Sequence, residues 1–354
     1  MPSIGALLII GLCLVSFLGN VAAVPLPEDG VVGPDEDGLG PSCTVIKRKE
    51  WRRLSKVQKK SYIKAVKCLQ DKPAIAKATI PNSISRFDDF QGVHIQQTFS
   101  IHFVGHFLAW HRYYLAIYEK ALREECDYKG AQPYWDWTLD ADNFIASPLW
   151  DPVTGFGGNG VPAPADGSPF AVPGATGGGC VTDGPFVDMR LHLGPGPSLA
   201  GTSRCLRRAF SPWIAKTFSN TAKVNNALAQ KDFGWFNKVV EGETNFLNVG
   251  IHGGGHYSIG GEAGDLYASP GEPVFYLHHA NLDRIYWQWQ SMNLPARLSD
   301  ISGPIQMFGP ITGPNVTLSF PIDLGPLAPA VTVQELMDTK GNKTGSGVLC
   351  YTYQ

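Results

Sequence analysis

Apolar and aromatic residues recur at helical spacing through the stretch 102–122. From His111 onward these positions follow a repeat of three to four residues: Tyr114, Leu115, Tyr118 and Leu122. Residues with this spacing share one face of an α-helix, and that face normally packs on the core. The pattern predicts a helix whose buried face begins at His111, so the His111 ring should point inward.

Two helices are predicted before this stretch. Ser55-x-x-Gln58 resembles a capping box, in which a serine side chain and a glutamine side chain bond each other's backbone N–H groups. Apolar positions follow it at helical spacing: Val57, Tyr62, Val66 and Leu69. Pro73 comes soon after the expected end of this helix.

The second of these helices should begin after Ser83 or Ser85. Phe87, Phe90 and His94 then stand at i, i+3 and i+7, so His94 should face inward with the two phenylalanines.

Helical patterns return later in the chain, at 204–218, 222–240 and 275–290. The segments 316–320 and 348–353 have the composition of short strands. No internal repeat of fixed period is present. The pattern therefore predicts one mainly α domain with a small helical bundle at its centre.

Residues 151–200 contain 20 Gly or Pro residues, too many for a regular helix or sheet. We expect a long ordered loop that lies over another surface and is held by Cys180. The alternative is a flexible linker between domains, which the apolar residues Phe156, Phe170 and Phe186 make less favourable.

The first residues differ in composition from the rest. Residues 1–23 form an apolar run that ends in small residues, which predicts a signal peptide cleaved near Ala23. The alternative, a membrane anchor, is disfavoured because the run from Ile4 to Leu18 is shorter than the ~20 residues of a span. The Gly/Pro-rich and acidic residues 24–41 predict a disordered leader or propeptide, and 42–354 the folded domain.

Charge excludes two classes of partner. Five acids occur in residues 24–46 without any base, so the remainder carries 29 bases against 26 acids. A body so near neutrality argues against a nucleic acid or an anionic membrane as partner.

Six cysteines remain once Cys13 leaves with the signal peptide, and an even number in a secreted chain predicts three disulfides. Of the fifteen possible pairings we expect Cys43–Cys350, Cys68–Cys126 and Cys180–Cys205. The sequons at Asn315 and Asn342 fit a secreted, extracellular glycoprotein.

Histidines carry the chemistry. Eight of the nine fall into two groups: His94, His102, His106 and His111, and then His252, His256, His278 and His279. A single buried imidazole is more often a satisfied core residue, but clustered imidazoles without cysteine or carboxylate partners suit copper or zinc. A two-zinc site would show bridging carboxylates and a di-iron bundle Glu-x-x-His pairs, and neither recurs here. Nitrogen-only ligation at two ions points to a copper pair and dioxygen.

Two motifs make a family resemblance specific. HxxxxFLxWHR (102–112) and FxxHHANLDRIYWQW (275–289) resemble the two copper signatures of the tyrosinase and catechol oxidase family, the type 3 copper proteins. PYWDW (133–137) and the closing Tyr-Thr-Tyr (351–353) are similar to family landmarks. The resemblance covers about 47–354 and is strongest to short, secreted, tyrosinase-like polyphenol oxidases of filamentous fungi. It implies a four-helix bundle holding a dinuclear copper site, with long Gly/Pro-rich loops and a few short peripheral strands.

Carried over by position, the resemblance gives each copper three histidines. The first copper takes His94, His102 and His111, and the second takes His252, His256 and His279. His106 and His278 are left as non-ligands. In the consecutive pair the two rings point about 100° apart on a helix, so only one can serve the metal; the family pattern selects His279.

Four further positions follow from the resemblance. Glu243, nine residues before His252, matches a residue that holds a water and helps to deprotonate a monophenol; its alternative is a solvated loop carboxylate. Gly253 stands where efficient monophenol hydroxylases often have asparagine. Tyr257 and Leu266 match residues that line the substrate pocket, or they serve only in packing. The glycines between His252 and His256 are expected to leave space for a substrate ring.

The function implied is a secreted copper oxidase that converts o-diphenols to o-quinones with dioxygen, with at most weak monophenol hydroxylation. The alternatives are an o-aminophenol oxidase and, less favoured, a non-enzymatic dioxygen-binding protein. The chain stops directly after the tyrosine motif, so no C-terminal shielding domain is expected.

Overall fold

The computed structural model describes residues 44–163, 172–243, 245, 247–307, 313–341 and 348–354. The predicted signal peptide and leader, Cys13, Cys43, Phe170 and Asn342 lie outside the described residues. Within them, no helix is both long enough and apolar enough to cross a membrane.

Two capping boxes fix the starts of the first helices. Helix α1 (Lys56–Asp71) begins after Ser55, whose side chain and that of Gln58 bond each other's backbone N–H groups as predicted. Helix α2 (Arg86–Ile101) begins after Ser85, where Asp88 plays the reciprocal part. The inward face predicted for α1 is wrong at Val57, which is 78% exposed because it lies in the first turn, beyond the helix's contact with the core.

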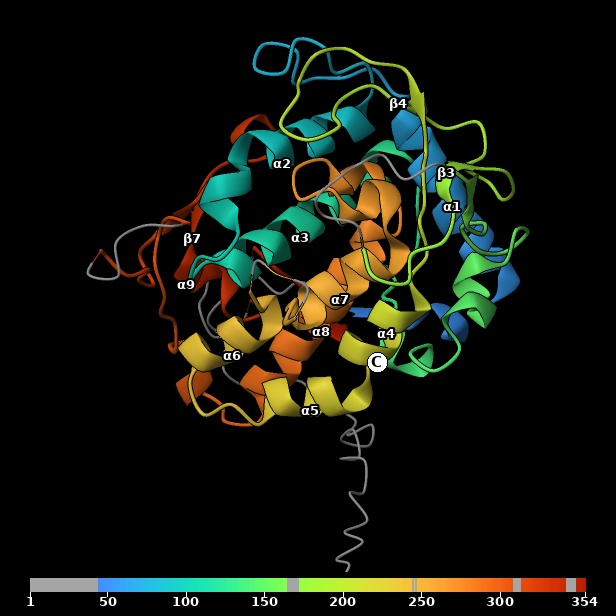
Figure 1. Ribbon diagram of the computed structural model, residues 1–354. Coiled ribbons are helices and arrows are strands. Elements are labelled where there is room, and N and C mark those ends of the chain that lie inside the picture. The colour runs from blue at the N-terminus through green and yellow to red at the C-terminus, as the bar shows by residue number, and fades with distance from the viewer. Residues whose placement is uncertain (1–43, 164–171, 244, 246, 308–312, 342–347) are drawn as a thin grey trace, which may run out of the picture. The chain divides into compact units, whose positions relative to one another are not determined.

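Four helices form the centre of the fold. They are α2, α3 (Phe107–Glu125), α7 (Gly250–Ile259) and α8 (Phe275–Ser291). Figure 1 shows them packed together, with α8 beside both α3 and α7. His94 and His111 are buried, as the helical spacing predicts. The fold is mainly α with a central four-helix bundle, as expected.

The remaining helices surround this bundle. They are α4 (Pro212–Phe218), α5 (Thr221–Leu228), α6 (Phe233–Glu241) and the short α9 (Val333–Leu336). The prediction of one helix over 204–218 is wrong in its first half, where Arg204 and Cys205 form strand β5 and α4 begins only at Pro212. The predicted helix 222–240 is two helices, because the Asp232 side chain caps a new start.

Short 3-10 helices connect these elements. They are η1 (Trp51–Arg53), η2 (Trp137–Leu139), η3 (Phe144–Ala146), η4 (Pro148–Trp150), η5 (Gly261–Gly264), η6 (Ser269–Gly271), η7 (Ala296–Leu298) and η8 (Gly325–Leu327).

In the described part of the chain the strands form four two-stranded sheets at the periphery. The pairs are β1 (Ile46–Arg48) with β8 (Tyr351–Tyr353), β2 (Gly160–Pro162) with β3 (Gly178–Val181), β4 (Arg190–Leu191) with β5 (Arg204–Cys205), and β6 (Pro321–Ile322) with β7 (Val331–Thr332). Of these four pairs, β1 and β8 run parallel, with Ile46 opposite Tyr351, and the other three are antiparallel. The strand predicted over 316–320 is instead found at 321–322, where β6 pairs with β7.

The Gly/Pro-rich region is ordered over its described residues, 151–163 and 172–200. Phe156 and Phe186 stack at 5.7 Å and are buried, and Phe156 also packs on Trp51. This region therefore covers a core surface, as expected, and is not a linker there.

Two of the three predicted disulfides are present. Cys68–Cys126 joins α1 to the end of α3, and Cys180–Cys205 joins β3 to β5. The pairing of Cys350 with Cys43 involves a residue outside the described ones and stays a prediction.

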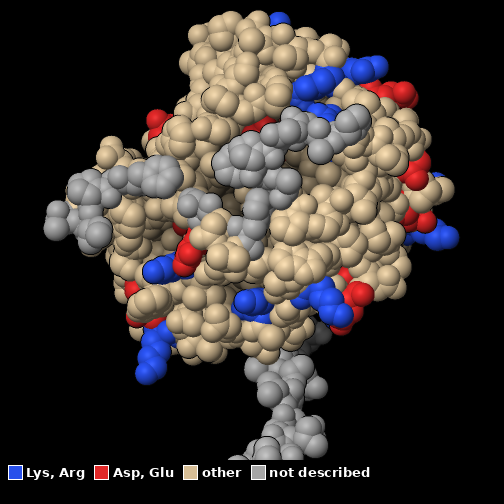
Figure 2. All heavy atoms as spheres, viewed as in Figure 1, with Lys and Arg blue, Asp and Glu red and all other residues tan. Residues whose placement is uncertain are grey.

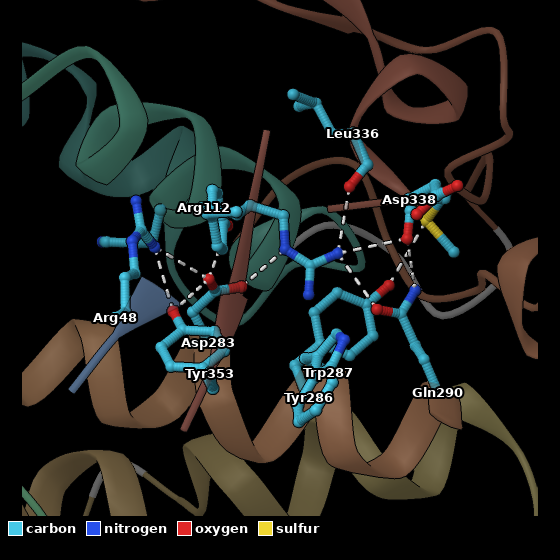
Figure 3. Close-up of polar contacts among 12 residues, drawn as sticks. Arg48, Arg112, Asp283, Tyr286, Trp287, Gln290, Leu336, Asp338 and Tyr353 are labelled. Atoms are coloured by element: carbon cyan, nitrogen blue, oxygen red, sulfur yellow. Dashed lines mark hydrogen bonds and ion pairs between the residues drawn. The ribbon is translucent and has the colours of Figure 1, made fainter. Parts of the chain in front are cut away.

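A buried charge cluster, which we call the Asp283 cluster, joins five elements that are distant in sequence. The Asp283 carboxylate on α8 lies between Arg48 of β1 and Arg112 of α3, and Tyr351 and Tyr353 of β8 donate to it (Figure 3). Arg112 also donates to the carbonyl of Leu336 in α9. Burial would raise the pKa of Asp283, but the two guanidinium groups outweigh it and hold that pKa below its usual value.

Candidate metal centre

Three buried histidines from the first sequence group meet at one point. His94 lies in α2, His102 directly follows the last residue of α2, and His111 lies in α3. Their candidate ligand atoms all lie within 4.8 Å of one another.

Each of these three rings donates its Nδ1–H to a backbone carbonyl. The acceptors are the carbonyls of Tyr267 (2.7 Å), Thr98 (2.9 Å) and Phe107 (2.9 Å), respectively. Since a carbonyl only accepts, the proton sits on Nδ1 and the lone pair on Nε2. Nε2 of His94 and of His111 is buried without a hydrogen-bond partner among the described groups. The three rings are therefore arranged as metal ligands usually are, with Nδ1 anchored and Nε2 available.

Four buried histidines form the second group: His252 and His256 on α7, and His278 and His279 on α8. His256 donates Nδ1–H to the carbonyl of Ala263 at 2.8 Å, and its Nε2 lies 3.0 Å from Nε2 of His279. Two nitrogens bound to one ion at about 2.0–2.1 Å in a tetrahedral site would lie ~3.3 Å apart. The Nε2 of His252 is buried without a hydrogen-bond partner among the described groups. These observations fit a second metal ion.

The two groups face each other. The His111 and His279 rings stack at 4.4 Å, and His102 and His252 at 5.9 Å. Two buried phenylalanine rings flank the gap, and each contacts histidines of both groups. Phe107 lies 4.7 Å from His111 and from His252. Phe275 lies 4.2 Å from His279 and 5.5 Å from His94.

Burial keeps these imidazoles neutral. It lowers the pKa of His102 to about 4 and the pKa of His256 to about 3, and it lowers those of His94, His111, His252 and His279 as well. A neutral ring is the form that binds a metal. Near neutral pH no proton has to leave before copper binds.

The remaining histidines are occupied otherwise. His106 donates from Nε2 to the Ser100 carbonyl at 2.7 Å and packs on Phe320. The rings of the first group donate from Nδ1 instead, so His106 is anchored through the opposite nitrogen. His192 bonds Asp88 at 2.9 Å. His278 accepts from Trp137. Of these three, only His278 lies close to a candidate metal site among the residues that the structure describes.

The expectation of open space at the glycines of α7 is wrong. A Cβ at Gly254 would lie 2.9 Å from Cβ of Phe218 in α4, and one at Gly255 would overlap the His278 ring. A Cβ at Gly253 would lie 2.7 Å from Cβ of Val249 and 3.3 Å from the Tyr257 ring. The glycines therefore allow close packing around α7.

The carboxylates near the site differ from the expectation. Glu243 is exposed and accepts from Asn245. Glu241, two residues earlier, is buried, and it accepts from the backbone N–H of Phe103 (2.6 Å) and from Asn237 (3.1 Å). Phe103 directly follows His102 and has a φ of +53°, unusual for a non-glycine residue.

Burial raises the pKa of Glu241 to about 8. Sequence reasoning missed this residue, although the spacing of Phe233, Phe236 and Val240 places position 241 on the buried face of α6.

The two predicted pocket residues lie near α7. Tyr257 is partly buried on α7, and burial raises its pKa. Leu266 is partly buried and lies between Ala263 and Tyr267, whose carbonyls anchor His256 and His94.

Comparison with known proteins finds a matching family model, similar relatives and a similar solved structure. The model of the common central domain of tyrosinase matches residues 84–292. A protein named tyrosinase P from Aspergillus terreus is 36% identical over 330 residues, covering 86% of this chain and 91% of the relative. An N-acetyl-6-hydroxytryptophan oxidase from Emericella nidulans is 33% identical over 343 residues, covering 87% and 92%. A solved polyphenol oxidase from Thermothelomyces thermophila, a glycine-to-asparagine variant, superposes with a TM-score of 0.80 at 39% identity and covers 88% of this chain and 89% of that one.

Proposed function

This chain belongs to the tyrosinase family of copper oxidases, and on that premise we propose that it oxidises o-diphenols to o-quinones with dioxygen, with at most weak hydroxylation of monophenols. The observation that carries the proposal is the pair of facing histidine groups, buried and neutral. In the proposed ligand set His94, His102 and His111 hold one copper, and His252, His256 and His279 hold the other.

The donor set fits this metal. Imidazole nitrogens without thiolates or carboxylates suit copper, and the buried Nε2 atoms without partners would otherwise lose hydrogen bonds. Bound copper supplies the electron transfer between the phenol and dioxygen. The protein's own residues fix the ligand geometry and exclude water.

Phe107 and Phe275 perform the second of these tasks. Both rings are buried and lie against histidines of both groups, so they cover part of the gap and keep water from it there. His252 (7%) and His256 (8%) are the most exposed of the proposed ligands, so a substrate should approach over α7. Gly253, Tyr257 and Leu266 lie on or beside this helix, which supports their proposed part in substrate binding.

We assign the proton-accepting role to Glu241 in place of Glu243. Glu241 is buried, bonds the residue that follows His102 and has a pKa raised to about 8, whereas Glu243 is exposed. A carboxylate with a pKa near the working pH is suited to accept the proton of a phenol.

We also propose that the protein is secreted. The two disulfides in the described part of the chain fit an oxidising compartment, as do the predicted signal peptide 1–23 and the exposed sequon at Asn315. Lys and Arg side chains are interspersed with Asp and Glu on the face shown in Figure 2, and such a surface of mixed charge does not favour a polyanion as partner.

The test is oxygen uptake by the copper-loaded protein with a catechol, a monophenol and an o-aminophenol. Turnover of the catechol is expected to be fastest. Preference for the aminophenol would favour the alternative, an o-aminophenol oxidase. One relative is named as an oxidase of a different aromatic compound, N-acetyl-6-hydroxytryptophan, which makes this comparison of substrates worthwhile. Reversible oxygen binding without turnover of any substrate would identify a carrier.

Variants of the consecutive pair test the ligand set. His279→Ala should lose oxidase activity and one of two bound coppers, whereas His278→Ala should keep both, as measured by copper content. The reverse result would show that the second ligand set is wrong.

A further inference from the structure

The second histidine group holds four rings where three ligands are proposed. The candidate ligand atoms of His252, His256, His278 and His279 all lie within 4.8 Å of one another. Distance therefore does not exclude His278 from the metal. The exclusion has to come from which of its nitrogens offers a lone pair.

Trp137 occupies one of these nitrogens. Its indole N–H donates to Nδ1 of His278 at 3.1 Å, and both side chains are buried. An indole nitrogen only donates, so Nδ1 must be the unprotonated nitrogen of a neutral ring, and the proton must sit on Nε2. The His278 Nε2 is buried without a hydrogen-bond partner among the described groups, like Nε2 of His94 and His111, but in this tautomer it carries the ring proton and offers no lone pair. The lone pair of Nδ1 is taken by the Trp137 N–H. The rings of His94 and His256 carry their proton on Nδ1, the opposite arrangement.

Packing keeps the His278 ring in this orientation. A Cβ at position 255 would overlap its Cε1 and Nδ1 atoms, so the ring lies directly against the Gly255 backbone. On another side it stacks on His252 at 5.9 Å with an interplanar angle of 11°. The ring has little room to turn and exchange its two nitrogens.

We propose that Trp137 is a positioning residue that keeps His278 out of the second metal site, by holding its Nδ1 and fixing the proton on Nε2. The proposal rests on the ligand set given above and explains why His279 alone serves from the consecutive pair. It also gives a role to the PYWDW block, which places Trp137 at the start of η2.

The first experiment needs no metal. Nitrogen-15 NMR of the histidine-labelled apoprotein distinguishes the two tautomers, and His278→Gln assigns the signal. The expected result is an Nε2-protonated His278. An Nδ1-protonated ring in the wild-type protein would overturn the proposal, even if copper binding and oxidase activity were as proposed.

The second experiment removes the donor. Trp137→Phe keeps an aromatic ring but deletes the N–H, so the His278 signal should shift or split into two tautomers. Trp135→Phe is the matched control, because Trp135 is equally buried in the same block but donates to Asp140 at 2.7 Å. An unchanged His278 signal in Trp137→Phe would overturn the proposal.

The third experiment uses Co²⁺ alone as the probe. His279→Ala should bind one equivalent, and adding Trp137→Phe should restore binding of a second through the released His278, while adding Trp135→Phe should not. Restoration by Trp137→Phe supports the proposal. Equal binding by the two double variants would contradict it. If His279→Ala itself binds two equivalents, the ligand set is wrong, which is a separate outcome.

Discussion

Gly253 shows how a single position combines a proposed catalytic preference with a packing limit. The family resemblance links asparagine at this position to monophenol hydroxylation. The structure adds that any Cβ here would lie 2.7 Å from Cβ of Val249, so a side chain has to displace the start of α7. A substitution therefore changes both the chemistry and the stability.

We expect Gly253→Asn to raise the ratio of monophenol to diphenol turnover and to lower the melting temperature. Overpacking of this kind typically costs ~1–3 kcal/mol. Gly253→Ala is the control, since it brings the same Cβ without the amide. If Gly253→Ala raised the ratio equally, the amide would have no part in it; the measurements are oxygen uptake and thermal unfolding.

Glu241 makes a prediction about pH. Burial raises its pKa to about 8, above the ~4.3 of an unfolded chain, so between these values the folded state binds more protons than the unfolded state. The contribution of this group to stability must therefore fall as pH rises from about 4 to 8. Glu241→Gln removes the titration, so the metal-free variant should gain stability relative to wild type over this range.

The same variant tests the proton-accepting role. Monophenol hydroxylation by the copper-loaded enzyme should fall by about 10²-fold or more, with a smaller effect on o-diphenol oxidation. Glu243→Gln is the control, because its carboxylate is exposed. A larger loss with Glu243→Gln would return the role to that residue.

At the scale of elements, backbone carbonyls of the segment 261–268 accept hydrogen bonds from one histidine of each group. The Ala263 carbonyl anchors His256 and the Tyr267 carbonyl anchors His94, whereas His102 and His111 bond carbonyls of their own helices or caps. Its position is fixed by the buried Glu262, which accepts from Gln91 at 3.0 Å and pairs with Arg204. The two metal sites therefore share one support.

Glu262→Gln should weaken both metal sites together. The variant leaves the Arg204 guanidinium without its counter-charge and frees the segment that carries both carbonyls. Loss of such supporting contacts typically costs 10–100-fold in metal affinity. Metal titration of the apoprotein measures it at each site.

Glu119→Gln is the matched control. Glu119 is also buried and pairs with an arginine, Arg48 at 2.6 Å, but it lies on α3 two turns beyond His111. It should lower stability without changing metal affinity. Weakening of one site alone by Glu262→Gln would contradict the shared support.

At the scale of the whole molecule, the Asp283 cluster holds together both ends of the described chain. β1 near residue 46 and β8 near residue 353 pair with each other and reach α8 through Asp283 (Figure 3). Asp283→Asn leaves two buried guanidinium groups with less compensation, so it should cost about 3–5 kcal/mol at neutral pH.

The cost should shrink in acid. The pKa of Asp283 is held below its usual value, so its stabilisation is present above the unfolded pKa of ~3.9 and is lost as pH falls through the folded value. Denaturant unfolding at pH 7 and near pH 3 measures the change. Tyr353→Phe, which removes a hydroxyl that donates to Asp283 and accepts from Arg48, should cost about 2 kcal/mol. An Asp283→Asn penalty as small as that, or one that grows in acid, would show that the charge is not what stabilises the cluster.

The sequence by itself determined the features that depend on neighbouring residues. The cap at Ser55, a helix start at Ser83 or Ser85, the inward side of His94 and His111, and the copper motifs with the family they indicate were readable, because side-chain capping, helical periodicity and short motifs act over only a few residues. The two disulfides in the described part of the chain join cysteines 58 and 25 residues apart, and which cysteines pair depends on how the chain folds.

Only the tertiary structure decided what depends on contacts between distant segments. It buried Glu241 and left Glu243 exposed, filled the space beside the glycines of α7 with α4 and His278, and set Trp137 against His278. Burial and hydrogen-bond partners arise when segments far apart in the chain meet, and no local pattern records which segments those are.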